Sequence, residues 1–338
     1  MTGDLGEVPM AATLVSKRYQ AKDELDAIEQ CFARGWSEGL PVVPPTEGRV
    51  RAMLEALALE PRHEIGVVVD RAVSVTAEKV AINAVMAGCK PEYMPVVVAA
   101  VEGITDPRFS YHGPSTSTGG AAVLLIVNGP IARELEVNSG DNLFGPGWRA
   151  NLTIGRAVRL VMRNVCGSIP GLLDRGTLGH PGKVSYVIAE NEAESRWTPL
   201  HVERGFGPAQ SAVTVMAAES PHQVYNQLSN TAEGVLTTLA DAMRISGNVM
   251  GQPHYCVVLA GEHMRTIAGD GWDKKRIRQY LWEHTRSSHA HLRRTYRMSG
   301  ALEPGDEERV RPLLASPDDI LVVAAGGRAG SFSCFIPG

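Results

Sequence analysis

Cysteine is scarce in this chain, and the five cysteines among 338 residues form no C-x-x-C pair. Their wide spacing matches neither a disulfide framework nor a zinc ribbon. Long apolar runs are also missing: no stretch approaches 18 consecutive apolar residues, so we expect no transmembrane helix. The first nine residues lack the basic and then apolar pattern of a signal peptide, which indicates a cytoplasmic protein.

An excess of charge of one sign is missing as well. The chain has 33 Lys and Arg residues against 37 Asp and Glu residues, a formal net charge of −4 at pH 7. This balance gives no electrostatic reason to expect binding to nucleic acid or to an anionic membrane surface. The local basic run at residues 274–276 lies on a predicted helix and is interpreted as a solvated face. We therefore expect neither a nucleic acid nor a membrane as a partner.

Three standard catalytic or phosphate-binding motifs are absent from the sequence. There is no G-x-x-x-x-G-K-[ST], no G-x-S-x-G and no H-E-x-x-H. These absences exclude a phosphate-binding P-loop, the nucleophile elbow of α/β-hydrolases and the zinc site of the common metalloproteases. Any site must therefore be found from residues that are brought together by the fold.

What the chain does have is a series of apolar runs separated by segments with helical spacing. A strand that is buried on both faces has a continuous run of apolar residues in its sequence. The runs lie at residues 65–69, 121–127, 184–189, 212–217, 255–259 and 320–324. Their alternation with helices favours an α/β fold with a largely parallel or mixed sheet flanked by helices, in one unit or in two sub-domains.

The clearest predicted helix covers residues 146–165, where apolar side chains recur along one face. A Ser-Pro-His-Gln sequence at 220–223 follows the capping-box pattern and predicts a helical region from there to Met243. The expected divisions are an N-terminal arm at residues 1–20, an α/β domain with a polar site region at 21–206, and a C-terminal α/β domain or sub-domain at 207–338.

Residues 138–206 contain the densest run of polar side chains, and they lie between apolar segments. The first candidate site in this run is the start of the helix predicted at residue 146. Free N–H groups and the helix dipole favour an anion there, and Asn142, Arg149 and Asn151 would add donors to a carboxylate. An ordinary capped helix end with surface amides is the alternative.

His180 and Lys183 form a second candidate site, on a turn directly before a predicted strand. An imidazole is suited to proton transfer near neutral pH, and an ammonium group stabilises negative charge that develops during a reaction. A surface turn with two solvated side chains is the alternative.

Two carboxylate-rich segments follow that strand. Glu190 and Glu192 are two residues apart, and His201 and Glu203 repeat the spacing. As a set, His201, Glu190 and Glu192 offer the nitrogen and oxygen ligands of a divalent metal ion, although no standard metal motif is present. Acid–base catalysis, with His201 and Glu203 taking part, or structural salt bridges are the other interpretations.

Two features near the C-terminus complete the candidates. A glycine-rich loop at 326–330 follows a predicted strand, and Arg328 in this loop is a candidate ligand-binding residue at the carboxyl end of the strand. Cys334 lies just beyond and is the candidate reactive thiol.

Four sequence blocks carry a resemblance to known proteins: GWSEGLPVVPPT at 35–46, NAVMAGCKPEY at 83–93, GPGWRANLTIG at 145–155 and PLHVERG at 199–205. Together they resemble a family of bacterial proteins of similar length that is associated with small thiol or selenol proteins of the UGSC type. The resemblance implies a soluble bacterial protein that forms one half of a two-component enzyme. It transfers no catalytic residue to this sequence.

The sequence thus predicts an enzyme that acts on a small anionic, carboxylate-type metabolite by acid–base lyase or hydrolase chemistry, with or without a divalent metal. In this interpretation loops that are distant in sequence meet at one edge of the sheet, so that Arg149, Lys183 and either His180 or His201 share one pocket. A thiol or redox component that uses Cys334 with a small thiol-protein partner is a second interpretation. A non-catalytic binding or scaffold subunit is the third. A homo-oligomer is expected.

Overall fold

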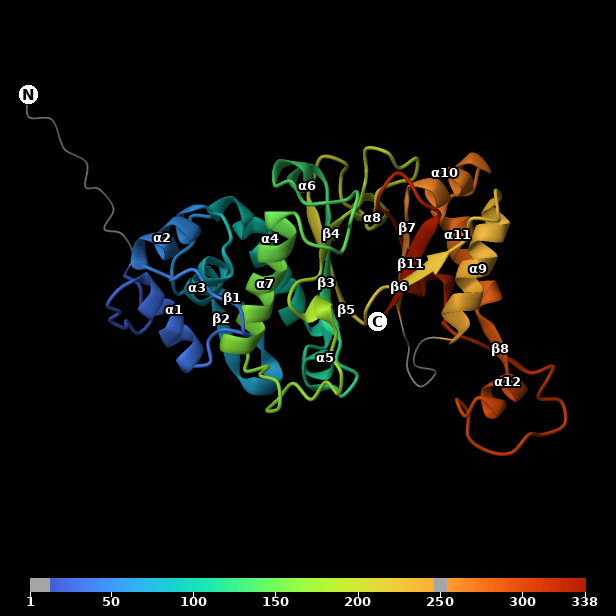
Figure 1. The fold of residues 1–338 in the computed structure, drawn as a ribbon, viewed down its shortest axis with the longest axis horizontal. Coiled ribbons are helices and arrows are strands. Elements are labelled where there is room, and N and C mark those ends of the chain that lie inside the picture. Colours follow the sequence, from blue (N-terminus) through green and yellow to red (C-terminus); the bar gives the residue numbers. More distant parts are fainter. Residues whose placement is uncertain (1–12, 246–253) are drawn as a thin grey trace, which may run out of the picture.

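The structure is a computed structural model that describes residues 13–245 and 254–338 (Figure 1). The first twelve residues of the predicted N-terminal arm lie outside the described residues. Helices and strands alternate along the rest of the chain and assemble into an α/β fold with two mixed sheets, which confirms the predicted class.

The first sheet has three strands in the order β4-β3-β5. Its members are β3 (Ala122–Asn128), β4 (Val187–Ala189) and β5 (Ala212–Ala218). Strand β3 pairs parallel with β4 and antiparallel with β5 along its whole length. Because β5 lies beyond residue 206, the first sheet takes a strand from each of the two predicted divisions.

The second sheet has four strands in the order β10-β7-β11-β6. Its members are β6 (His222–Tyr225), β7 (Tyr255–Leu259), β10 (Ile320–Ala324) and β11 (Phe332–Pro337). Strands β7 and β10 are parallel, and β11 is antiparallel to both of its neighbours. The parallel pair is the part of this sheet that the apolar runs predicted.

The two sheets pack face to face and are covered by helices on their outer faces. Side chains of a strand point alternately to its two faces. Accordingly Leu124 and Ile126 enter a core shared with Val258 of the second sheet, whereas Leu125 and Val127 enter a core shared with the N-terminal helices. The resulting layers are helices, sheet, sheet and helices, and Figure 1 shows the helices of the two halves on opposite sides.

The helices divide between these two outer layers. Of those on the side of the first sheet, α4 (Met94–Thr105) and α7 (Arg149–Asn164) pack on its strands. Helices α3 (Ala77–Ala87), α2 (Glu47–Glu55) and α1 (Glu24–Ala33) lie farther from the sheet (Figure 1). Those on the second sheet are α9 (Ala232–Ile245), α10 (Gly261–Gly269) and α11 (Lys274–His284). The shorter elements used below are α8 (Leu200–Glu203), β1 (Glu64–Val68) and the 3-10 turn Pro181–Lys183. None of the helices in the described part of the chain has the length and apolarity that crossing a bilayer requires.

Glycine allows α7 to approach its sheet closely. A Cβ atom added at Gly155 would lie 2.2 Å from the Ser185 Oγ and 2.9 Å from the Val187 Cγ2. These distances are shorter than any van der Waals contact, so only glycine fits here without a shift of helix or strand. Helix α7 therefore packs on β4 more tightly than its apolar stripe alone predicts.

Three local predictions were wrong. The capping pattern at 220–223 does not begin a helix, because His222–Tyr225 pairs with β11 as an edge strand and the helix begins only at Ala232. The helix predicted from residue 146 begins at Arg149. The apolar segment at 184–189 is a strand only from Val187 onward.

Candidate functional site

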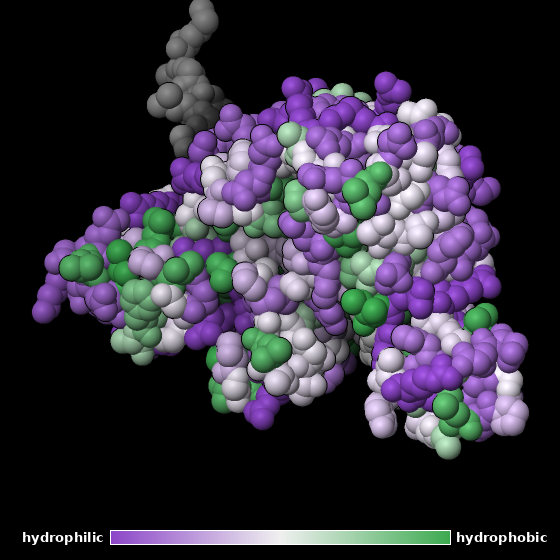
Figure 2. All heavy atoms as spheres, turned by 45° about the vertical axis from the view of Figure 1, so that its right-hand side comes forward, coloured by the Kyte–Doolittle hydropathy of each residue, from purple (hydrophilic) through white to green (hydrophobic). Residues whose placement is uncertain are grey.

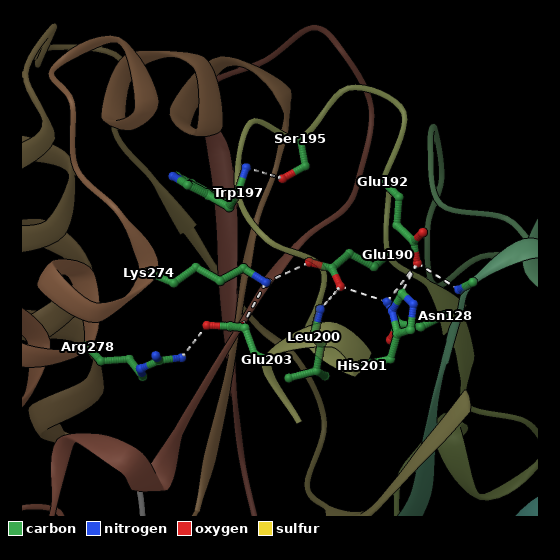
Figure 3. Close-up of polar contacts among 11 residues, drawn as sticks. Asn128, Glu190, Glu192, Ser195, Trp197, Leu200, His201, Glu203, Lys274 and Arg278 are labelled. Carbon is green, nitrogen blue, oxygen red and sulfur yellow. Dashed lines mark hydrogen bonds and ion pairs between the residues drawn. The ribbon is translucent and has the colours of Figure 1, made fainter. Parts of the chain in front are cut away.

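Polar side chains gather where β3 and β4 end, in the part of an α/β sheet where ligands usually bind. Asn128 is the last residue of β3, and Glu190 directly follows β4. Figure 3 shows these side chains pointing toward those of Glu192, His201 and Glu203, with Lys274 and Arg278 reaching in from α11. The sequence pattern had grouped Glu190, Glu192, His201 and Glu203 with His180 as possible ligands. The structure brings the first four together and leaves His180 elsewhere.

Glu190 is the centre of this cluster, and its side chain is 0% exposed. Its Oε1 accepts a hydrogen bond from the Lys274 Nζ at 2.8 Å. Its Oε2 accepts from the Asn128 Nδ2 at 2.7 Å and from the Leu200 N at 2.7 Å. A buried carboxylate is tolerated only when it is paired in this way. Because Leu200 is the first residue of α8, Glu190 also fixes the short helix that carries His201.

Lys274 is 3% exposed at its side chain and lies between two carboxylates, Glu190 and Glu203. The Glu203 Oε2 is 3.1 Å from the Lys274 Nζ, and its Oε1 is 3.1 Å from the Arg278 Nη1. A cation at the first position of a helix opposes the helix dipole. The two carboxylates explain why a lysine is nevertheless buried at the start of α11.

His201 is the unusual member of the cluster, since its side chain is 1% exposed and neither ring nitrogen has a hydrogen-bond partner among the described residues. Its Nδ1 lies 3.7 Å from the Glu192 Oε1, too far for a hydrogen bond. Buried polar atoms without partners are rare and costly, which marks this imidazole as a position that needs a functional explanation.

Glu192 is held in place beside His201 by two donors. Its Oε1 accepts from the Gly129 N at 2.7 Å and from the Asn128 Nδ2 at 3.0 Å. Gly129 has a φ of +84°, and a Cβ atom there would lie 2.2 Å from the Gln210 O, so the turn that presents this N–H requires glycine. The side chain of Glu192 is 27% exposed and forms the open side of the cluster.

The predicted metal site does not fit this geometry. Both oxygens of Glu190 already accept hydrogen bonds from N–H donors, one of them a lysine ammonium group that a cation would repel. Within residues 13–245 and 254–338, no three His, Cys, Asp or Glu side chains are arranged to hold a metal ion. We therefore assign no metal to His201, Glu190 and Glu192.

His180 and Lys183 lie at the other end of the first sheet, before β4 rather than after it. The His180 Nε2 is 3.1 Å from the Ala218 O, and burial lowers the pKa of this imidazole. Lys183 pairs with Asp174 at 2.8 Å, and Arg159 pairs with the same carboxylate at 2.9 Å. The expectation that these two residues share a pocket with His201 was wrong, because the length of β4 lies between them.

The donors expected to bind an anion at the start of α7 are used within the protein. Arg149 donates its Nε and Nη2 to the Gly88 O at 3.1 and 2.9 Å. Asn151 accepts from the Asn138 N and donates to the Val187 O, both at 2.8 Å. Asn142 donates to the Pro146 O at 2.9 Å. Asn151 thus joins the loop at 138–142 to α7 and β4, whereas Arg149 joins α7 to the end of α3.

Loops that are distant in sequence do meet near the cluster. The Asn191 N donates to the Ala324 O at 2.7 Å, and the Gly326 N donates to the Ser139 O at 2.8 Å. Arg328 follows in the same loop, and its Nε donates to a carboxylate oxygen of Glu194 at 2.6 Å. The ends of β4 and β10 and the loop at 138–142 thus form one edge, on which the side chain of Arg328 is 80% exposed.

Cys334 lies in the middle of β11 and is buried between its neighbours β6 and β7. Burial raises the pKa of its thiol to about 12, so the nucleophilic thiolate is a minute fraction at neutral pH. All five cysteines of the chain are buried and free. The geometry does not favour a reactive thiol at this position.

Sequence reasoning missed Lys274, Arg278 and Asn128. The basic run that begins at Lys274 was interpreted as a solvated face, and for Lys274 this was wrong. The available signal was the position of Lys274 directly after Asp273, the N-cap residue of α11, where a cation is electrostatically unfavourable. Asn128 gave no signal, because in the sequence it directly follows the apolar run at 121–127 and precedes a Gly-Pro pair, as the first polar residue of an ordinary turn does.

In comparisons with known proteins, the chain matches no family model and no curated protein. The resemblance to bacterial proteins associated with the UGSC type therefore stays a prediction.

Proposed function

We propose that the chain is an enzyme that acts on a small carboxylate-type metabolite by acid–base chemistry, with His201 as the group that transfers the proton. The observation that carries this proposal is the buried His201 imidazole, which has no hydrogen-bond partner among the described residues and lies 3.7 Å from the carboxylate of Glu192. Hydrogen bonds between catalytic groups are often long before substrate binds and shorten in the complex.

In the proposed reaction, Glu192 accepts a hydrogen bond from the Nδ1–H of His201. This bond sets the tautomer of the ring, so that Nε2 can take a proton from the substrate or give one to its leaving group. The Gly129 N and the Asn128 amide hold the Glu192 carboxylate where it can do so. Such proton transfer serves both lyase and hydrolase chemistry.

The remaining residues of the cluster hold the catalytic groups in position and do not themselves contact the substrate in this proposal. Glu190 and Lys274 are positioning residues in this proposal, since Glu190 binds the first N–H of α8 and Lys274 neutralises Glu190. Glu203 joins Lys274 to Arg278 and has the same kind of role.

In this proposal Arg328 binds the carboxylate of the substrate, because its exposed guanidinium lies on the edge where β4 and β10 end.

The proposal is tested by solvent-exchange NMR. The protein is incubated in D₂O with a panel of hydroxy, keto and unsaturated carboxylic acids, and deuterium incorporation or product formation is followed. We expect at least one acid to react, and His201→Gln to slow this reaction by about 10²- to 10⁴-fold, the range typical of a lost general acid or base. His63→Ala, which removes an exposed imidazole directly before β1, is the matched control.

Two results would contradict the proposal. If His201→Gln reacted at the wild-type rate, the proton would be moved by another group. If no acid in the panel exchanged or reacted, the interpretation as a non-catalytic binding or scaffold subunit would be favoured. Arg328→Met should raise the KM of a reactive acid more than it lowers kcat, because the proposed contact is to a part of the substrate that does not react.

A cytoplasmic homo-oligomer stays a prediction from the sequence. Figure 2 shows that, on the face it presents, hydrophobic residues lie in separate small groups among hydrophilic ones rather than in one continuous patch. That face therefore does not resemble the large apolar interface of an obligate oligomer. Sedimentation analysis of the purified chain would test the assembly state.

A further inference from the structure

A pocket of about 710 Å³ lies in the N-terminal half of the molecule, apart from the cluster around His201. It is lined by most residues of the segment 14–21, by helices α1, α2 and α3, and by the last turn of α7. Its volume falls within the range of about 300 to 1,000 Å³ that is typical of small-molecule sites. None of its lining residues belongs to the His201 cluster.

The walls of the pocket are largely apolar. Val50, Ile82 and Met86 contribute aliphatic surface from α2 and α3, and Trp36 contributes an aromatic face. The ring of Tyr19 meets that of Trp36 edge-on, with the ring centroids 5.1 Å apart. Such walls favour a ligand with an apolar body, whose transfer from water is the main source of binding free energy in a pocket of this kind.

One side of the pocket is formed by an extended segment, residues 14–21, that contains neither helix nor strand. The segment is anchored by Glu78, a residue that is 1% exposed and whose carboxylate accepts from the Val15 N and the Ser16 N, both at 2.8 Å. Because this anchor holds the segment through its backbone, its side chains remain available to line the pocket and its entrance.

The charges at the pocket are not balanced. Its two carboxylates are occupied: Glu78 binds the backbone of residues 15 and 16, and Glu47 pairs with Arg18 at 3.2 Å and with another arginine of its own helix. The ammonium groups of Lys17 and Lys79 form no salt bridge with any described residue. The Lys17 Nζ lies 5.3 Å from the centre of the Tyr19 ring, and the Lys79 Nζ donates to the Ser16 Oγ at 3.2 Å, while the charge of Lys79 helps to lower the pKa of the neighbouring Glu78 carboxyl. Two cations that form no salt bridge with a described carboxylate thus lie beside an apolar pocket.

We propose that this pocket binds a small molecule with an apolar body and one carboxylate group, with Lys17 and Lys79 as the partners of the carboxylate. The site is separate from the proposed active site. Asn164 lines the pocket at one end of α7, whereas Asn151 contacts the loop near β4 at the other end, about 20 Å away at 1.5 Å per residue. The proposal does not depend on the chemistry assigned to His201.

The test uses octanoate and 1-octanol as probes, with binding to the full-length protein measured by isothermal titration calorimetry. We expect both probes to bind, and octanoate to bind at least about fivefold more tightly, which corresponds to one favourable charge interaction. The double variant Lys17→Met/Lys79→Met should lose this preference and still bind 1-octanol. Lys22→Met, which removes an exposed lysine that does not line the pocket, is the matched control.

A second variant shows where the probes bind. Ala27 lines the pocket from α1, so Ala27→Phe should fill part of the volume and weaken binding of both probes, while a thermal melt shows that the protein remains folded. His201→Gln should leave octanoate binding unchanged. The proposal is overturned if neither probe binds, if the lysine double variant keeps its preference for octanoate, or if His201→Gln rather than Ala27→Phe abolishes binding.

Discussion

The Nζ atom of Lys274 lies 2.8 Å from the Oε1 atom of Glu190, and the two side chains are 3% and 0% exposed. The pair joins the first helix turn of α11 on the second sheet to the end of β4 in the first sheet. An ion pair at this depth contributes little compared with a well-packed apolar pair, but the removal of one partner leaves a buried charge uncompensated. It therefore makes the packing of the two halves sensitive to a single substitution.

Lys274→Met should lower the free energy of unfolding by about 3 to 5 kcal/mol, the usual cost of leaving one member of a buried ion pair alone. Urea unfolding followed by circular dichroism measures this change. Lys275→Met, at the exposed neighbouring position, should change the free energy by less than about 0.5 kcal/mol. Equal effects of the two substitutions would show that the Lys274–Glu190 pair does not hold the structure.

The fold could be predicted from the sequence where a strand is buried on both faces. The apolar run at 121–127 predicted β3 because neither face of that strand meets water. Strand β11 was missed because Ser333 and Cys334 interrupt its apolar pattern, and its pairing with β7 involves residues more than 70 positions away. Strand β6 was mistaken for a helix start because a local capping pattern favoured the helix, whereas the strand is fixed by its long-range pairing with β11.

The candidate site could be predicted only on one of its two sides. Glu190, Glu192 and His201 lie close together in sequence and are visible there as an unusual polar group. Lys274 is 84 positions from Glu190, and nothing local indicates that its ammonium group neutralises that carboxylate. The mistaken grouping of Lys183 with His201 has the same origin, since sequence proximity does not tell which end of a strand a loop occupies.

Gly155→Ala should destabilise the protein even though it adds a single methyl group to a helix. The new Cβ atom would overlap the Ser185 Oγ and the Val187 Cγ2, so α7 and β4 would have to move apart. The expected cost is about 1 to 3 kcal/mol, which is typical of overpacking. Thermal unfolding measures this cost.

The matched control for that substitution is Gly48→Ala, in helix α2. No atom lies within 4 Å of a Cβ built there, so the gain in helix propensity should stabilise the protein by up to about 1 kcal/mol. A stabilising effect of Gly155→Ala would show that α7 lies farther from β4 than the structure places it.

Alkylation tests the thiol interpretation directly. Because burial raises the pKa of Cys334 to about 12, iodoacetamide at pH 8 should modify it at least about a hundredfold more slowly in the native protein than in urea. Mass spectrometry of the peptide that contains Cys334 measures both rates. Rapid modification in the native protein, with loss of activity, would favour the redox component instead of the acid–base enzyme.

The ion pair between Lys183 and Asp174 should make stability depend on pH in the acid range. Burial alone would raise the pKa of Asp174, but the hydrogen bonds from Lys183 and Gly176 and the charges of Lys183 and Arg159 outweigh it, so the pKa lies below its ordinary value of about 3.9. A carboxyl group whose pKa is lowered by folding contributes stability above its unfolded-state pKa. That contribution is lost as the pH falls through the folded-state value.

Lys183→Met should raise the pKa of Asp174 and remove most of this contribution. The difference in free energy of unfolding between wild type and variant should therefore be largest near pH 6 and should shrink as the pH falls from about 4 toward 2. Urea unfolding at several pH values measures it, and Arg175→Met, which alters a neighbouring cation that makes no salt bridge with a described residue, serves as the control. A difference that stayed constant over this range would show that Lys183 stabilises the protein through its packing and not through the charge of Asp174.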